Sequence, residues 1–201
     1  KFIKLNPGHF SEIYEPRFIN NIYFDNLNFE NYFDTINGIS KRKKIRLRWY
    51  GDFFGLIDNP VLEIKKKNGK VVSKIQHDFP PFKVELSTNI ENIIDNISLG
   101  SNFFFMKNKS PSIINRYERK YFLSNNKKFR ITIDKNQEFS NPKNVKKPKK
   151  MYPLLSHMIV IELKFDVKWE KEAMEITNAF PFRVNKNSKY VNALKALHVI
   201  K

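Results

Sequence analysis

The sequence contains no cysteine and no hydrophobic run approaching the roughly 20 residues of a transmembrane helix. Without cysteine, the chain forms neither disulfide bonds nor thiolate metal sites, and no signal-peptide hydrophobic region is visible. We therefore expect a cytoplasmic protein. The chain also lacks a P-loop, a glycine-rich dinucleotide turn and a Ser-His-Asp arrangement, and its four histidines show no metal-ligand spacing. A mechanism based on a protein nucleophile is therefore unsupported.

Negative charge is scarce as well. The chain has 20 acidic and 37 basic residues, which gives a net charge of +17 and a pI near 9.9. So large an excess destabilises a compact chain through self-repulsion, and it indicates a polyanionic partner. Nucleic acid, an anionic membrane surface and phosphate chains all qualify. A content of 41% hydrophobic and 14% aromatic residues is typical of a globular protein with a sizeable core.

The stretch Lys44–Gly51 alternates strictly between polar and apolar residues, with the period of two that is typical of a β-strand. One face is apolar and requires a core, whereas the other face carries cations about 7 Å apart. Because arginine cannot lose its charge, such a row is stable only beside water or beside an anion. The cations are Lys44, Arg46 and Arg48, and the opposite face holds Ile45, Leu47 and Trp49.

Similar patterns predict the other elements of a mainly β (α+β) fold. The predicted strands span residues 21–25, 61–67, 71–76, 113–123, 129–134 and 158–165, with a hairpin turn at Asn68-Gly69. The predicted helices span residues 88–99, 169–178 and 188–199, with Asn187 or Ser188 as the last N-cap, and residues 27–37 are predicted to form a helix or a loop. Residues 1–5 are predicted to end a helix, and residues 141–150 to form a loop. Because no linker or repeat is visible, we expect residues 1–201 to form one domain.

Basic side chains lie on the polar face of nearly every predicted strand, where an ordinary solvated sheet would mix both signs of charge. Like charges that face one another across strands are destabilising, so the pattern indicates a polyanionic ligand. An open sheet could lay this face on a nucleic-acid backbone. A closed barrel could instead turn it inward around a small, dense polyanion. The polar faces hold Lys44, Arg46, Arg48, Lys65, Lys67, Arg119, Arg130 and Lys164 among Glu63, Asp134 and Glu162.

Two features favour the closed barrel. The opposite strand faces are apolar throughout, so they need covering on all sides. The carboxylates would only repel phosphate on a nucleic-acid platform, whereas inside a barrel they can hold Mg²⁺ or Mn²⁺ that bridges phosphates. In addition, most aromatic residues fall on the apolar faces, whereas single-strand binders stack bases on aromatic residues of the basic face. We therefore expect no specific nucleic-acid partner.

Seven short motifs occur in order and resemble those of a known family. They are Asn21–Asp25, Arg46–Gly51, Leu62–Lys65, Tyr117–Arg119, Phe129–Asp134, Ile161–Lys164 and Asn187–Tyr190. From about His9 to the C-terminus the chain resembles the VTC domain, the polyphosphate polymerase domain of the triphosphate tunnel metalloenzyme (CYTH-like) superfamily. The resemblance implies an eight-stranded antiparallel tunnel barrel jacketed by a few helices. The family's first strand has no counterpart before Lys1, so we expect a barrel that lacks this strand.

The resemblance also implies a set of site residues. Those expected to grip the phosphates during catalysis are Arg46, Arg48, Lys65, Arg119, Arg130 and Lys189. Those expected to bind substrate in addition are Lys74, Tyr117, Lys164 and Ser188. Glu162 matches the carboxylate that holds the divalent metal, Mn²⁺ or Mg²⁺, with Glu63 and Asp134 as auxiliary ligands. The alternative role of Glu162 is to form a salt bridge with Arg46 or Arg48.

The implied function is transfer of the γ-phosphate of ATP onto a polyphosphate chain by a metal-dependent phosphotransferase. Such domains sometimes accompany membrane-associated partner proteins. Two alternatives remain open from the sequence. The first is hydrolysis of triphosphate or tripolyphosphate, for which relatives place more carboxylates in the tunnel than this chain shows. The second is a non-catalytic polyphosphate sensor, which needs the cations but not the metal.

Overall fold

The structure, a computed structural model, describes residues 2–69, 71–85, 88–93, 105–142, 152–153 and 158–199. The strands are β1 (Ser11–Asp25), β2 (Lys41–Tyr50), β3 (Gly55–Ile57), β4 (Val61–Asn68), β5 (Val71–Asp78), β6 (Phe82–Val84), β7 (Ser110–Leu123), β8 (Arg130–Ser140), β9 (Tyr152–Pro153) and β10 (Val160–Lys164). The helices are α1 (Glu30–Ile36), the 3-10 helix η3 (Val167–Trp169), α3 (Glu170–Asn178) and α4 (Lys189–Ala196), and residues 90–93 are also helical.

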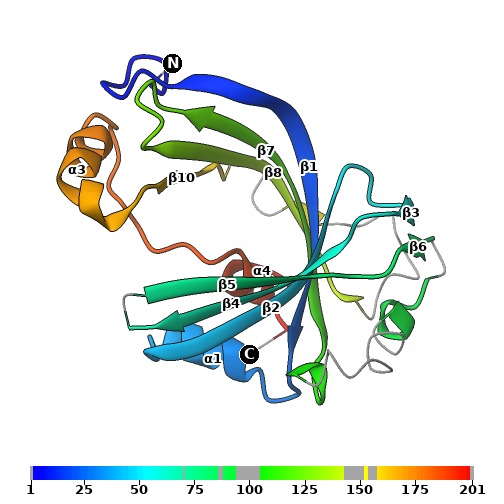
Figure 1. The fold of residues 1–201 in the computed structure, drawn as a ribbon. Helices are drawn as coiled ribbons and strands as arrows, with labels where there is room; N and C mark the ends of the chain where they lie inside the picture. Colours follow the sequence, from blue (N-terminus) through cyan, green and yellow to red (C-terminus); the bar gives the residue numbers. More distant parts are fainter. Residues whose placement is uncertain are drawn as a thin grey trace.

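The main sheet is antiparallel and strongly curled. Seven strands follow the order β10-β8-β7-β1-β2-β4-β5, with β9 added beside β8, and β3 pairs with β6 in a separate small sheet (Figure 1). The mainly β fold with a few helices is therefore confirmed. The sheet is a half-barrel, because β5 and β10 are its edges and do not pair with each other in the described part of the chain.

The long strand β1 explains much of the curl. It pairs with β7 along its whole length, whereas only Ile19 to Phe24 pair with β2. Its register with β7 shifts at three places, between Glu12 and Tyr14, between Tyr14 and Arg17, and between Tyr23 and Phe24. Such irregularities bend a strand and increase its twist. The sheet therefore separates into a β2-β4-β5 arm and a β7-β8-β10 arm on either side of β1 (Figure 1).

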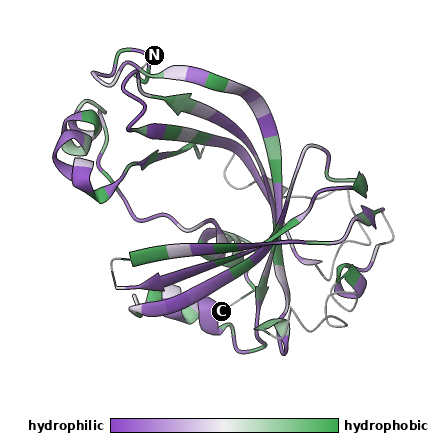
Figure 2. Ribbon diagram, viewed as in Figure 1, coloured by the Kyte–Doolittle hydropathy of each residue, from purple (hydrophilic) through white to green (hydrophobic). Residues whose placement is uncertain are grey.

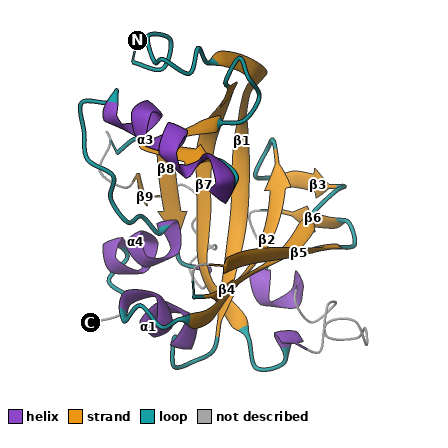
Figure 3. Ribbon diagram, turned by 60° about the vertical axis from the view of Figure 1, so that its left-hand side comes forward, coloured by secondary structure: helices purple, strands orange, loops and turns teal. Residues whose placement is uncertain are grey.

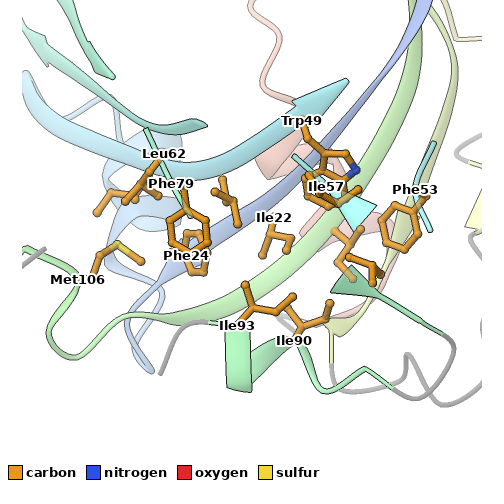
Figure 4. Close-up of a cluster of buried hydrophobic side chains, with 14 of the residues drawn as sticks. Ile22, Phe24, Trp49, Phe53, Ile57, Leu62, Phe79, Ile90, Ile93 and Met106 are labelled. Atoms are coloured by element: carbon orange, nitrogen blue, oxygen red, sulfur yellow. The ribbon is translucent and has the colours of Figure 1, made fainter. Parts of the chain in front are cut away.

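The apolar faces of β2 and β4 pack in the largest hydrophobic cluster. Trp49, Leu62 and Ile22 are almost fully buried there, against the small sheet and against Ile90 and Ile93 of the helical turn (Figure 4). The alternation along β2 produces this arrangement, because Ile45, Leu47 and Trp49, at every second position, enter the cluster. In Figure 2 hydrophilic and hydrophobic bands alternate along the strands accordingly.

Helices α3 and α4 lie at different places along the sheet (Figure 3), and each packs in its own smaller hydrophobic cluster. Ala173 and Ile176 of α3 pack on the outer face of β8, in a cluster with Ile131. Tyr190 and Leu194 of α4 belong to a different cluster, which also includes residues of α1, β1 and β7. Helix α4 therefore covers one end of the inner face of the sheet, where its first turn can reach that face.

Several predicted boundaries differ from the structure. Strand β1 begins at Ser11, ten residues before the predicted strand, and residues 2–8 form turns where the end of a helix was predicted. Strands β3 and β6 were not predicted, and β8 continues to Ser140. The predicted helix at residues 88–99 is helical at 90–93, and its part from residue 94 onward lies outside the described residues. The predicted loop at 141–150 likewise lies mostly outside them. The Asn68-Gly69 hairpin, α1, α3, α4 and the Ser188 N-cap are confirmed.

No helix among the described residues is long and apolar enough to cross a membrane.

Candidate functional site

The inner face of the curled sheet contains a cavity of ≈ 500 Å³. Strands β2, β4 and β5 line one side, β7 and β10 line the other, and the segment that enters α4 completes the wall. Eight Lys or Arg side chains line the cavity against two Glu side chains, so it is strongly electropositive. Ten of the eleven predicted site residues are among its lining, namely Arg46, Arg48, Lys65, Lys74, Tyr117, Arg119, Glu162, Lys164, Ser188 and Lys189.

Arg130 is the predicted site residue that does not line the cavity. It is exposed at the first residue of β8, directly across from Lys164 on β10. Burial lowers the pKa of Lys164, and the neighbouring charges of Arg119 and Arg130 add to this effect. Arg130 therefore lies beside Lys164 of the cavity lining without lining the cavity itself.

Glu63 organises the cations of the β2-β4-β5 arm. Its carboxylate is buried and accepts a hydrogen bond from Arg46 Nε at 2.7 Å. It also lies 2.5 Å from Lys74 Nζ and 3.5 Å from Arg48 Nη1. Burial alone would raise the pKa of Glu63, but the charges of Arg46 and Arg48 outweigh burial and lower it to about 2. Glu63 is therefore ionised and occupied by cations, which leaves it poorly suited to bind a metal.

Asp134 plays the same role for the opposite arm. Its carboxylate is fully buried and forms a bidentate pair with Arg119, with Nε–Oδ1 at 2.5 Å and Nη2–Oδ2 at 2.7 Å. Lys189 Nζ lies 2.5 Å from Oδ2. Burial raises the pKa of Asp134, but the hydrogen bond from Arg119 and the charge of Lys189 lower it overall. Both predicted auxiliary metal ligands, Glu63 and Asp134, thus hold cations in place instead.

Glu162 differs from these two carboxylates. Its side chain is 45% exposed, and among the described residues its one ion pair is with Lys164, at 3.6 Å. Arg46 and Arg48, its alternative partners from the sequence, pair with Glu63 instead. Mg²⁺ is commonly held by one or two carboxylates together with substrate phosphates, so a single open carboxylate fits this mode of binding. No group of three or more His, Asp or Glu side chains suited to a metal ion occurs in the described part of the chain.

Lys44 lines the cavity and was not among the predicted site residues, although it shares a strand face with Arg46 and Arg48. Its Nζ donates a hydrogen bond to Ser188 Oγ at 2.9 Å, and Ser188 caps α4. Burial lowers the pKa of Lys44 to about 8, with repulsion from Lys65 as the next cause. The alternation of β2 was the signal that could have identified it.

Helix α4 is anchored by a buried carboxylate. Tyr190 Oη donates a hydrogen bond to Asp25 Oδ2 at 2.6 Å, and Asp25 also accepts from the backbone N–H groups of Asn31 and Tyr32 in α1. Tyr190 also stacks on Tyr23, with the ring centroids 5.3 Å apart. These contacts fix the helix end that carries Lys189 into the cavity.

A family model of the VTC domain matches residues 9–198. The chain belongs to the VTC domain family. No curated protein matches this VTC domain in sequence. Among solved structures it is similar to a candidate adenylate cyclase from Vibrio parahaemolyticus, with 13% identity, a TM-score of 0.36 and 66% of this chain covered. The match covers 58% of the length of that protein.

Membership of the VTC domain family supports a phosphoryl-related function of the triphosphate-tunnel type. Among the described residues, the electropositive cavity offers the cations that a phosphate-containing ligand requires.

Proposed function

We propose that this VTC domain is a polyphosphate polymerase that transfers the γ-phosphate of ATP onto a polyphosphate chain inside the cavity. The observation that carries the proposal is the convergence of eight cations on one cavity, with Glu162 as its accessible carboxylate. Glu63 and Asp134 compensate only part of this charge, and a bound polyanion would compensate the rest. A linear phosphate chain offers closely spaced negative charges that match them.

The guanidinium groups are held in place before the ligand arrives. Arg48 and Arg119 are each 7% exposed, and their carboxylate partners are buried behind them. Tyr117 Oη and Asn21 Oδ1 add further hydrogen-bond partners to Arg48. Donors that are already oriented stabilise developing charge without reorganising during the reaction. Arginine also grips phosphate through two parallel N–H groups, which gives a defined orientation.

This chemistry needs no nucleophile from the protein. The terminal phosphate of a growing chain is itself an anionic nucleophile, and phosphoryl transfer depends mainly on positioning and charge neutralisation. In our proposal Arg46, Arg48 and Arg119 align the two phosphate groups, and Lys189 neutralises charge from the α4 side. Glu162 would hold a divalent cation, which supplies bridging of phosphate oxygens and further neutralisation.

Incubation of the full-length protein with ATP and Mn²⁺, followed by gel electrophoresis and staining for polyphosphate, tests the proposal. We expect polymer to accumulate together with ADP. Release of free phosphate without polymer would identify a hydrolase instead. Tight binding of tripolyphosphate without any turnover would identify a binding module, and no binding of triphosphate compounds would overturn the proposed function altogether.

A further inference from the structure

We propose that Arg17, held among Tyr14, Tyr50 and Tyr121, forms an additional phosphate-binding position just outside the cavity. It would bind a phosphate chain that extends beyond a triphosphate. The inference rests on the proposed function, because it concerns the length of the chain that the same basic face accepts. It adds a residue that neither the predicted site nor the cavity lining includes.

Arg17 lies on the same face of the sheet as the cavity. It is directly opposite Arg119 in the antiparallel pair of β1 and β7, and such partners project to the same side. The Tyr121 ring lies between them, with its centroid 5.1 Å from Arg17 Cζ and 6.0 Å from Arg119 Cζ. Arg119 lines the cavity, so Arg17 is the next basic residue beyond the cavity lining on this face, with Tyr121 in contact with both.

Three tyrosine rings hold the Arg17 guanidinium. Its Cζ is 5.2 Å from the Tyr14 centroid and 5.0 Å from the Tyr50 centroid, in addition to the contact with Tyr121. Tyr14 and Tyr121 also contact each other edge to face at 5.6 Å. Tyr50 is the last residue of β2, so the cluster sits where β2 leaves β1. The rings restrict an otherwise flexible, exposed side chain, which lowers the entropy cost of binding a ligand.

The charge of Arg17 is not neutralised by another side chain. Within the described residues, no carboxylate lies within salt-bridge distance of Arg17, whereas its partner Arg119 is paired with Asp134. A pair of like charges directly across two strands is destabilising. Aromatic rings attract a cation but carry no net charge, so the three tyrosines do not remove the repulsion between Arg17 and Arg119. An anion bound beside Arg17 would remove it.

Phosphate fits this position better than a nucleobase. The three rings surround a guanidinium whose positive charge attracts phosphate, whereas a nucleobase carries no charge that it would attract. The guanidinium is exposed and has no hydrogen bond to a side chain among the described residues, so its N–H groups are available to an anion. A chain gripped by Arg119 at the cavity edge would reach Arg17 within a few phosphate units, because directly paired Cα atoms are about 4.5–5.5 Å apart.

The test is the affinity of the full-length protein and its Arg17→Gln variant for long-chain polyphosphate, tripolyphosphate and ATP. We expect Arg17→Gln to weaken long-chain polyphosphate binding about tenfold, as loss of one charge-assisted hydrogen-bonded contact would. Binding of tripolyphosphate and ATP should remain within about twofold of the parent. Lys43→Gln is the matched control, since it removes one exposed charge from the opposite face of β2 and should leave all three affinities unchanged.

Four outcomes would overturn the Arg17 site. Equal weakening for Arg17→Gln and Lys43→Gln would show a bulk charge effect. Weakening of ATP binding with tripolyphosphate unaffected would show that the cluster binds a nucleobase. Unchanged long-chain binding in Arg17→Gln would exclude the site while leaving the proposed function intact. Failure of the parent to bind tripolyphosphate would overturn the proposed function, and the Arg17 site with it. The melting temperature of each variant reports whether it is folded.

Discussion

At the scale of single residues, the three carboxylates of the inner face have different tasks. Glu63 and Asp134 are buried beneath arginine and lysine side chains, so each secures cations that would otherwise repel one another. Glu162 is about half exposed, and within the part of the chain that the structure describes its one ion pair is the long contact with Lys164. The sequence placed all three on polar strand faces, but it could not distinguish their roles. Those roles depend on which side chains meet across strands.

Glu162→Gln should separate binding from turnover. The substitution keeps the size of the side chain but removes its charge, so a metal held there would be lost. We expect polyphosphate synthesis to fall by more than about 100-fold, whereas tripolyphosphate affinity stays equal or improves because one repulsive charge is removed. Glu175→Gln, on the exposed surface of α3, is the control. A Glu162→Gln variant that makes polymer near the parent rate would exclude the metal-binding role.

Lys44 should make ligand affinity dependent on pH. With its pKa lowered to about 8, Lys44 is charged at pH 7 and mostly neutral at pH 9. A bound polyanion favours the charged form, so binding should take up a proton as the pH approaches 8. We expect tripolyphosphate affinity to fall about tenfold between pH 7 and pH 9, measured by calorimetry in two buffers of different ionisation enthalpy. Lys44→Gln should flatten this dependence, and an unchanged profile in that variant would contradict the assignment.

At the scale of elements, alternation predicted the strands that are buried on one face. β2 and β4 were placed within three residues of their ends, because their apolar residues enter the core at every second position. The first half of β1 was missed because it is mostly exposed, contains Pro16 and is irregular in register, which together erase the period. The short strands β3 and β6 have three residues each, too few for a pattern.

Helix α4 depends on its hydrogen bond to β1, and Tyr190→Phe should show this. The variant keeps the ring packed against Tyr23 but leaves the buried Asp25 carboxylate without the hydroxyl donor at 2.6 Å. We expect a loss of about 2 kcal/mol in the free energy of unfolding, typical of a hydrogen bond to a charged group. Faster amide exchange should follow in α4, together with weaker tripolyphosphate binding through Lys189. A variant as stable as the parent would show that ring packing alone seats the helix.

At the scale of the whole molecule, eight of the 37 lysine and arginine residues line one concave cavity, where their charges add. The mainly β fold and the convergence of most predicted site residues were accessible from sequence, because a period of two fixes which side chains share a face. The position of Arg130 outside the cavity could not be predicted from the sequence, because this position depends on how the edge of the sheet curls.

Competition between polyphosphate and DNA should distinguish the cavity from a general basic surface. We expect polyphosphate to bind at least about 100-fold more tightly than single-stranded or duplex DNA at physiological ionic strength, because the confined field suits a narrow chain. DNA binding should also weaken more steeply as salt is raised. Equal affinities for the two polymers would favour an open nucleic-acid-binding sheet.

The separation of the sheet into two arms has a mechanical consequence. The arms are joined through β1, their free edges are β5 and β10, and both present cations to the space between them. Without a ligand, electrostatic repulsion between these cations favours a larger separation of the two arms. A polyanion bound between the arms attracts the cations of both and favours a smaller separation. We expect tripolyphosphate to reduce the radius of gyration in small-angle X-ray scattering and to slow amide exchange along β5 and β10. In high salt, tripolyphosphate should have a smaller effect on the radius of gyration and on amide exchange, because screening weakens both the repulsion between the arms and their attraction to the ligand.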